Sequence, residues 1–204
     1  MIMNNPDDKR YKQLKEIRDE LLVFNKSPLF EYRTKNNFHP VVGEGDHYAH
    51  IMFVGEAPGE NEAKQGRPFC GASGRVLDEL LQSIGLSREK VYVTNIVKDR
   101  PPDNRDPLPA EIELYAPFLD KQIDIIQPKV IATLGRFSMS YIMTRLGLSL
   151  ELGSISLLHG QTFEAETKYG TVNIVPLYHP AVALYAGGKK AELLKDFQVL
   201  KKFL

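Results

Sequence analysis

The chain has 204 residues, 43% of them hydrophobic and 25% charged, which fits one globular domain over residues 1–204 and excludes a disordered or fibrous protein. Lys plus Arg and Asp plus Glu both number 26, so the overall charge gives no support for nucleic-acid binding, and such binding would need a local basic patch. The single cysteine, Cys70, excludes an internal disulfide and a cysteine-based metal site, and the lack of a long apolar run indicates a cytoplasmic protein without a membrane segment, which we expect to be monomeric.

The first half of the chain alternates helical and strand patterns. Apolar residues at Leu14, Ile17 and Leu21 have the spacing of an amphipathic helix, and a short apolar run before Gly55 predicts a buried strand. Ser73 is expected to cap the helix that follows it. In chain order we expect a helix over residues 11–24, an irregular stretch over 27–46, a strand over 50–54, a loop over 56–73, a helix over 74–84 and a strand over 91–96.

The second half continues this alternation. Prolines exclude regular structure from residues 98–109, and Pro128 ends the helix before it. We expect a helix over 110–127, a strand over 130–134, a helix over 137–146, paired strands within 155–175 and a last helix from 189 onward. Strands that alternate with helices predict a three-layer α/β/α sandwich around a central, mostly parallel four-stranded sheet.

Unusual polar loops follow three of the predicted strands. They begin at Glu56, at Asn95 and at His179. Ligands of such sheets bind beyond the carboxyl ends of the strands, so convergence of the three loops would form one site.

The loop over residues 55–62 is glycine-rich but does not match a phosphate-binding motif. It has neither the Gly-Lys-Ser/Thr ending of a P-loop nor the G-x-G-x-x-G spacing, which disfavours ATP and NAD. Its carboxylates Glu56, Glu60 and Glu62 suit a cation, a water or a neutral base. His47 and His50 are three residues apart but have no further ligand cluster, so we predict no metal site.

Four blocks of sequence together resemble the family 4 uracil-DNA glycosylases, in the order of that family and over nearly the whole chain. Any one block would be weak support alone. The blocks are Gly55-Glu56-Ala57-Pro58-Gly59; Gly66-Arg67-Pro68-Phe69 with Gly71-Ala72-Ser73-Gly74; Thr94-Asn95-Ile96-Val97-Lys98 with the Arg100-Pro101-Pro102 segment; and His179-Pro180-Ala181.

The resemblance implies a role for each matched residue. His179 would bond the uracil carbonyl next to the glycosidic nitrogen, Asn95 would read the polar edge of uracil, and Phe69 would stack on the flipped ring. Glu56 and Ala57 would face the sugar and the attacking water. Gly59 and Glu62 are expected to support the site from behind these residues, with Gly59 where other glycosylase families place a bulky residue against the methyl group of thymine.

These roles fit the chemistry of N-glycosidic bond cleavage. Electrons of the broken bond move into uracil, so a donor at the ring oxygen stabilises the transition state, by about 3 to 4 kcal/mol in comparable sites. The sugar becomes cation-like, so a carboxylate stabilises it or orients water. The base must leave the helix before the pocket reaches it.

Residues around the predicted site are candidates for DNA contacts. Lys98, Arg100 and Arg105 flank the predicted site and are candidates for phosphate contacts, and Leu184 or Tyr185 would be the wedge that fills the space of the flipped base. Residues 99–107 contain no histidine, so we expect no permanent covalent trapping of DNA.

The chain departs from the family at the positions of its cofactor. Family 4 members hold a four-iron four-sulfur cluster on four cysteines, and the matching positions here are Phe24, Ser27, Asp99 and Tyr115. Cys70 belongs to another block. We therefore predict no iron-sulfur cluster, with Phe24 and Tyr115 filling its volume through apolar contacts.

Each residue has a plainer interpretation: His179 as part of a capped turn, Glu56 as a helix-capping or ion-paired carboxylate, and Phe69 as core. The order of the motifs favours a DNA repair enzyme that hydrolyses the bond of deoxyuridine and leaves an abasic site. Two alternatives stay open: a catalytically weak protein that binds uracil-containing DNA, and a glycosylase for another deaminated base such as hypoxanthine or xanthine.

Overall fold

A central mixed sheet organises the protein, which is described here by a computed structural model covering residues 8–186 and 188–204. Within these residues six strands pair in the order β1-β3-β2-β4-β6-β5. The four inner strands are parallel, and β1 and β5 are antiparallel to their neighbours. The strands are β1 Glu44–Gly45, β2 Ile51–Gly55, β3 Tyr92–Asn95, β4 Val130–Leu134, β5 Phe163–Thr167 and β6 Gly170–Leu177.

The predicted central, mostly parallel sheet is confirmed, but the predicted count of four strands is wrong. The edge strand β1 has only two residues, too few to produce an alternating pattern in the sequence. The other edge strand, β5, belongs to the hairpin with β6 that residues 155–175 predict. The sheet therefore has two antiparallel edges around its parallel centre.

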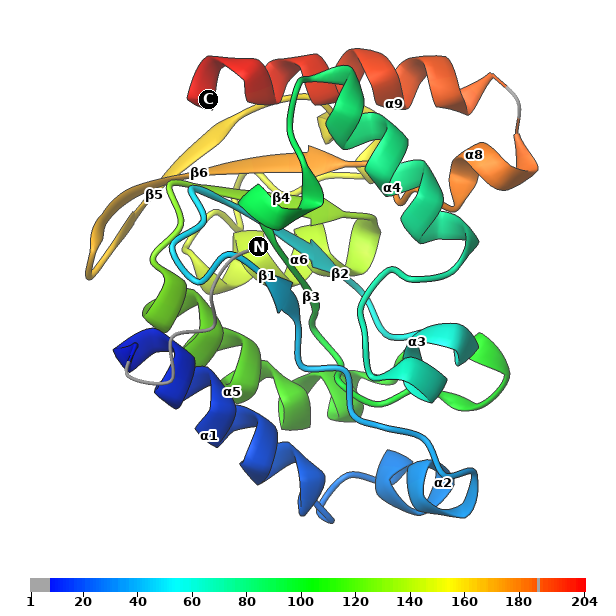
Figure 1. Cartoon of the computed structure of the whole chain (residues 1–204). Helices are drawn as coiled ribbons and strands as arrows, with labels where there is room; N and C mark the ends of the chain where they lie inside the picture. The colour runs from blue at the N-terminus through cyan, green and yellow to red at the C-terminus, as the bar shows by residue number, and fades with distance from the viewer. Residues whose placement is uncertain (1–7, 187) are drawn as a thin grey trace.

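Helices cover both faces of this sheet, as the three-layer prediction requires (Figure 1). Side chains of β2 alternate between the two cores: Met52 and Val54 face one, and Ile51 and Phe53 face the other. The helices α1 Lys9–Leu22, α5 Pro109–Ile126 and α6 Arg136–Arg145 pack in the first core, and α4 Ala72–Ser83 and α9 Lys189–Phe197 in the second.

The long helices lie close to their predicted bounds. α1 begins at Lys9 because the Asp8 side chain accepts a hydrogen bond from the Tyr11 amide at 3.0 Å. The predicted cap at Ser73 is wrong: Gly71 precedes α4, and Ser73 lies within its first turn. Helices also form in stretches that were expected to be irregular or extended, namely α2 Leu29–Lys35, α3 Glu60–Gln65, α7 Ile155–Leu158 and α8 Val182–Tyr185.

The carboxyl ends of the parallel strands lie along one edge of the sheet. Gly55 at the end of β2 pairs with Asn95 at the end of β3, and Leu134 at the end of β4 pairs with Leu177 at the end of β6. The polar loops after β2, β3 and β6 therefore leave the sheet at the same edge, with β4 between β2 and β6. In the part of the chain that the structure describes, no helix has the length and apolar character of a membrane span.

Candidate active site

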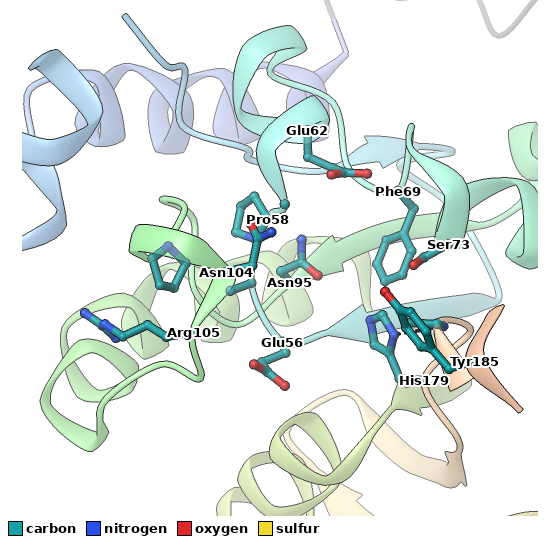
Figure 2. Close-up of a pocket in the computed structure, with 14 residues that line it drawn as sticks. Glu56, Pro58, Glu62, Phe69, Ser73, Asn95, Asn104, Arg105, His179 and Tyr185 are labelled. Carbon is teal, nitrogen blue, oxygen red and sulfur yellow. Dashed lines mark hydrogen bonds between the residues drawn. The ribbon is translucent and has the colours of Figure 1, made fainter. Parts of the chain in front are cut away.

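A pocket of about 360 Å³ opens at this edge of the sheet. It is lined by segments that follow β2, β3 and β6, and the structure brings Glu56, Asn95 and His179 together in it (Figure 2). Phe69 also lines the pocket. One wall is formed by Pro101, Asn104 and Arg105. The predicted convergence of three strand-end loops is thus what the structure contains.

Gly55 lies beneath the pocket and lets two of its side chains approach each other. A Cβ atom at Gly55 would fall 2.3 Å from Oδ1 of Asn95 and 2.7 Å from Cζ of Phe69. The carboxamide and the aromatic ring therefore meet over a residue that has no side chain. Oδ1 of Asn95 is buried and has no hydrogen-bond partner among the described residues, which leaves it free to accept from a ligand.

The turn that presents Phe69 is held by a carboxylate and by the start of α4. Phe69 has a positive φ of 48°, and its ring is 5.6 Å from that of His179. Oε1 of Glu62 accepts from the amides of Cys70 at 3.0 Å and Gly71 at 2.8 Å. A Cβ atom at Gly74 would fall 1.8 Å from the Phe69 carbonyl oxygen, so the helix packs directly against the turn.

His179 is held as a neutral ring with a defined donor. The Ala181 amide donates to Nδ1 at 3.2 Å, so Nδ1 carries the lone pair. Burial lowers the pKa of His179 to about 4, with Glu62 opposing that shift. At neutral pH the proton is therefore on Nε2, which makes Nε2–H a donor without a charge to desolvate.

Glu56 lines the same pocket, and the charges of Asp106 and Arg136 affect its pKa. Burial, with the charge of Asp106 added, raises the pKa of Glu56 to about 7, while Arg136 opposes the increase. Asp106 and Arg136 form an exposed ion pair with each other. A carboxyl with a pKa near neutrality is suited to acid–base work.

Most of the predicted site residues line the pocket. Besides Glu56, Phe69, Asn95 and His179, these are Ala57, Gly59, Glu62, Arg105 and Tyr185. A Cβ atom at Gly59 would fall 2.7 Å from Oε2 of Glu62, so the carboxylate occupies the space that a larger residue at 59 would take. On the rim, Tyr185 is 88% exposed; Leu184 is also exposed but does not line the pocket.

Two of the residues predicted to contact DNA phosphates, Lys98 and Arg100, do not line the pocket. Lys98 has no exposed surface: its Nζ donates to the Asn95 carbonyl and Gln122 Oε1 at 2.6 Å and to Thr94 Oγ1 at 2.8 Å. The prediction that Lys98 contacts DNA is therefore wrong, because its side chain is buried between Thr94 of β3 and Gln122 of α5.

Arg100 is also largely buried and engaged within the protein. It is only 8% exposed, and it donates to Asn104 Oδ1 at 2.8 Å and to the Tyr32 hydroxyl at 3.2 Å. Arg105 lines the pocket while its guanidinium pairs with Glu111. Of the three basic candidates, Arg105 alone borders the pocket.

Several lining residues were not predicted. Pro101 and Asn104 belong to the proline-rich loop, where their place after the asparagine strand was the available signal. Ser73, which the sequence predicts as a helix cap, also lines the pocket, and its neighbours in the Gly71–Gly74 block belong to a motif that indicates the site. The others are Pro58 and Ala181, each next to a predicted residue.

The four positions that match cluster cysteines in family 4 lie together, and their side chains do not fit an iron-sulfur cluster. Phe24 packs edge-on against Tyr115 with 5.5 Å between ring centroids, and the Tyr115 hydroxyl donates to Asp99 at 2.6 Å. Ser27 is buried beside them. Such clusters are held by cysteine thiolates, and none is present here. The aromatic contact agrees with the prediction, whereas the polar contact to Asp99 was not foreseen.

Comparison with known proteins agrees with the architecture of the site. The sequence model described as "Uracil DNA glycosylase superfamily" matches residues 42–201, a span that holds the whole pocket. The chain therefore belongs to the uracil-DNA glycosylase superfamily.

Individual relatives indicate which type of uracil-DNA glycosylase the chain resembles. The chain is 45% identical to a type-4 uracil-DNA glycosylase of Sulfurisphaera tokodaii over 93% of this chain and 84% of that protein. It is 42% identical to a type-4 enzyme of Archaeoglobus fulgidus over 92% and 91%. A type-5 uracil-DNA glycosylase of Thermus thermophilus is 34% identical, over only 53% and 56%. Within the superfamily the chain belongs with the type-4 uracil-DNA glycosylases.

Proposed function

We propose that the protein is a monofunctional uracil-DNA glycosylase, which hydrolyses the N-glycosidic bond of deoxyuridine in DNA and leaves an abasic site. One observation carries the proposal: a free acceptor on Asn95, an Nε2–H donor on His179 and the ring of Phe69 border one pocket. This set suits a flat ring that has both a donor and an acceptor on its edge.

His179 would stabilise the leaving base. As the bond breaks, negative charge grows on the uracil oxygen beside the glycosidic nitrogen, and Nε2–H donates to that oxygen. Because the ring is already neutral and fixed by Ala181, little reorganisation is needed at that moment. Uracil leaves as an anion that then takes a proton.

Glu56 would act on the other half of the bond. The sugar acquires positive charge, and the Glu56 carboxylate, with Ala57 beside it, faces the space where that sugar and the attacking water would lie. The carboxylate stabilises the sugar cation and orients the water, whose oxygen adds to the sugar carbon while its proton passes to Glu56; that proton is then released to solvent, from which the uracil anion takes one, so that water is the only reactant consumed.

Asn95 and Phe69 would select and hold the base. Oδ1 of Asn95 accepts from the ring N–H of uracil and its amide group donates to the neighbouring carbonyl, a pattern that cytosine does not match. Stacking on Phe69 adds about 1 to 3 kcal/mol. The DNA would be held at the rim, with Arg105 near a phosphate and exposed Tyr185, or its neighbour Leu184, inserted into the gap left by the flipped base.

We further propose that this activity needs no iron-sulfur cluster. The Tyr115 hydroxyl donates a hydrogen bond to Asp99, and both residues occupy positions where the resemblance expects cysteine ligands. An iron determination and a visible absorption spectrum of the pure protein should reveal no stoichiometric iron; a bound cluster would refute this part of the proposal.

The decisive experiment is uracil release from labelled oligonucleotides under single-turnover conditions. His179→Ala should lower the rate about 100- to 1000-fold while the protein stays folded. His50→Ala is the matched control, since His50 is exposed at the opposite end of β2. An unchanged rate in His179→Ala would remove the catalytic role.

The same experiment separates the alternatives. Single- and double-stranded oligonucleotides that carry uracil, hypoxanthine or xanthine should yield abasic sites at uracil. Retention of uracil DNA on gels without base release would indicate a binding protein, and release from hypoxanthine or xanthine alone would indicate another substrate.

A further inference from the structure

A buried ion pair with a hydroxyl partner lies outside the pocket and takes no part in the chemistry proposed above. Arg33 on α2, Asp99 after β3 and Tyr115 on α5 are 4%, 0% and 0% exposed. Nη1 of Arg33 is 3.0 Å from both carboxylate oxygens of Asp99, and the Tyr115 hydroxyl donates to Oδ2 at 2.6 Å. We refer to these three residues as the Asp99 cluster.

The Asp99 cluster joins four segments of the chain. Arg33 also donates to the last carbonyls of α1, to Leu21 at 2.9 Å and to Leu22 at 2.8 Å. These carbonyls carry the negative end of the helix dipole, so a cation is favourable there. One guanidinium thus ties α1 and α2 to Asp99, and Tyr115 ties Asp99 to α5.

Asp99 is the middle residue of three consecutive anchors. Lys98 before it is bonded to Asn95 and Gln122, and Arg100 after it is bonded to Asn104 and Tyr32. All three side chains are buried, and their polar partners lie on different elements of the fold. The backbone between the end of β3 and the pocket wall therefore has a fixed path.

That path ends in the wall of the pocket. Pro101, Asn104 and Arg105 line the pocket, two to six residues beyond Asp99, and Asn104 is held in the left-handed region with a φ of 52°. A short segment with such a conformation stays in place only where its surroundings determine it. The bond from Arg100 to Asn104 transmits the position of the anchors to this wall.

We infer that the Asp99 cluster is the positioning element for the pocket wall at residues 101–105, and so for the DNA that meets this wall. It cross-links α1, α2 and α5 to the wall by hydrogen bonds and one ion pair, at the positions where the family's cysteines would place a metal cluster. The part of this inference that concerns DNA rests on the proposed function.

Tyr115→Phe tests the cluster with the least damage, because it removes one hydroxyl and keeps the ring against Phe24. Asp99→Asn is the second variant, which removes the charge and leaves Arg33 without its counterion. The matched control is Glu20→Gln, which breaks the exposed pair with Lys121 between the same helices α1 and α5. All proteins are compared at a temperature where each is folded.

The first measurement is amide hydrogen exchange and does not depend on activity. Tyr115→Phe should speed exchange in a peptide covering residues 100–106 by roughly tenfold, with peptides from β2 and β4 unchanged. Glu20→Gln should match the wild type. Unchanged exchange at 100–106 in a folded Tyr115→Phe protein would overturn the inference, and uniformly faster exchange would reduce the cluster to a general stabilising role.

The second measurement is single-turnover uracil release over a range of enzyme concentrations. Tyr115→Phe should raise the half-saturating concentration about 3- to 10-fold and change the maximal rate less than about twofold, because Asn95 at the end of β3 and His179 just beyond β6 keep their places. Equal loss in both quantities would contradict a role confined to the wall. If the wild type releases no uracil, the proposed function fails, and hydrogen exchange still decides the positioning role.

Discussion

At the scale of a residue, Asn95 leaves a buried carboxamide oxygen without a partner among the described residues. Such an atom costs about 1 to 3 kcal/mol of stability, which a bound base would recover. Asn95→Leu, which keeps the shape and removes the polar atoms, should unfold at an equal or higher urea concentration while uracil release falls at least about 100-fold. A loss of more than about 2 kcal/mol would mean that the oxygen already has a partner in the free protein.

Glu56 makes the activity dependent on pH. If its carboxylate is the active form, the maximal rate of uracil release should rise with pH and level off above about pH 7, the pKa of Glu56. Asp106→Asn removes a charge that raises this pKa and should move the rise to lower pH; Arg136→Gln should move it to higher pH. The profiles are measured by single-turnover release, and shifts in the same direction would show that the rise belongs to another group.

At the scale of an element, the position of Phe69 depends on how closely α4 approaches it. Gly74→Ala would place a methyl group 1.8 Å from the Phe69 carbonyl oxygen, so either the helix or the turn must move. We expect a loss of about 1 to 3 kcal/mol in unfolding free energy and at least a tenfold loss of uracil release. Gly153→Ala is the control, because its nearest neighbours are side-chain atoms of Leu158 at 3.7 Å or more. Full activity in Gly74→Ala would show that the turn adapts.

Elements with a strong apolar period could be predicted from the sequence. Strand β4 has the predicted bounds, since its five residues are all buried and are followed by Gly135. The short helices α2 and α3 could not be predicted from the sequence, because a helix of one or two turns is too short to show a hydrophobic period. The site residues Glu56, Asn95 and His179 could be predicted because each lies at or just beyond the end of a strand and belongs to a motif that resembles the family. Lys98 was misplaced because its burial depends on Gln122, a partner 24 residues away.

At the scale of the whole molecule, Glu56 and His179, two titratable residues of the pocket, affect stability in opposite directions. The pKa of Glu56 rises from 4.5 to about 7 on folding, so its contribution to stability is lost as pH rises through that interval. The pKa of His179 falls from 6.5 to about 4, so its contribution is lost as pH falls through that interval. Between about pH 4.5 and 6.5 the two effects oppose each other, which flattens the pH dependence of the native protein.

Removal of one group should expose the effect of the other. Glu56→Gln cannot ionise, so its stability relative to the wild type should increase from near zero below pH 4.5 to a plateau of about 1 to 3 kcal/mol above pH 7. Its own stability should then rise with pH up to about 6.5, because the contribution of His179 remains. Urea unfolding at a series of pH values measures both curves. Parallel curves for variant and wild type would mean that Glu56 is not desolvated on folding. A more stable but inactive Glu56→Gln protein would instead mean that the fold sacrifices stability to keep a carboxyl group at the place where the sugar develops its charge.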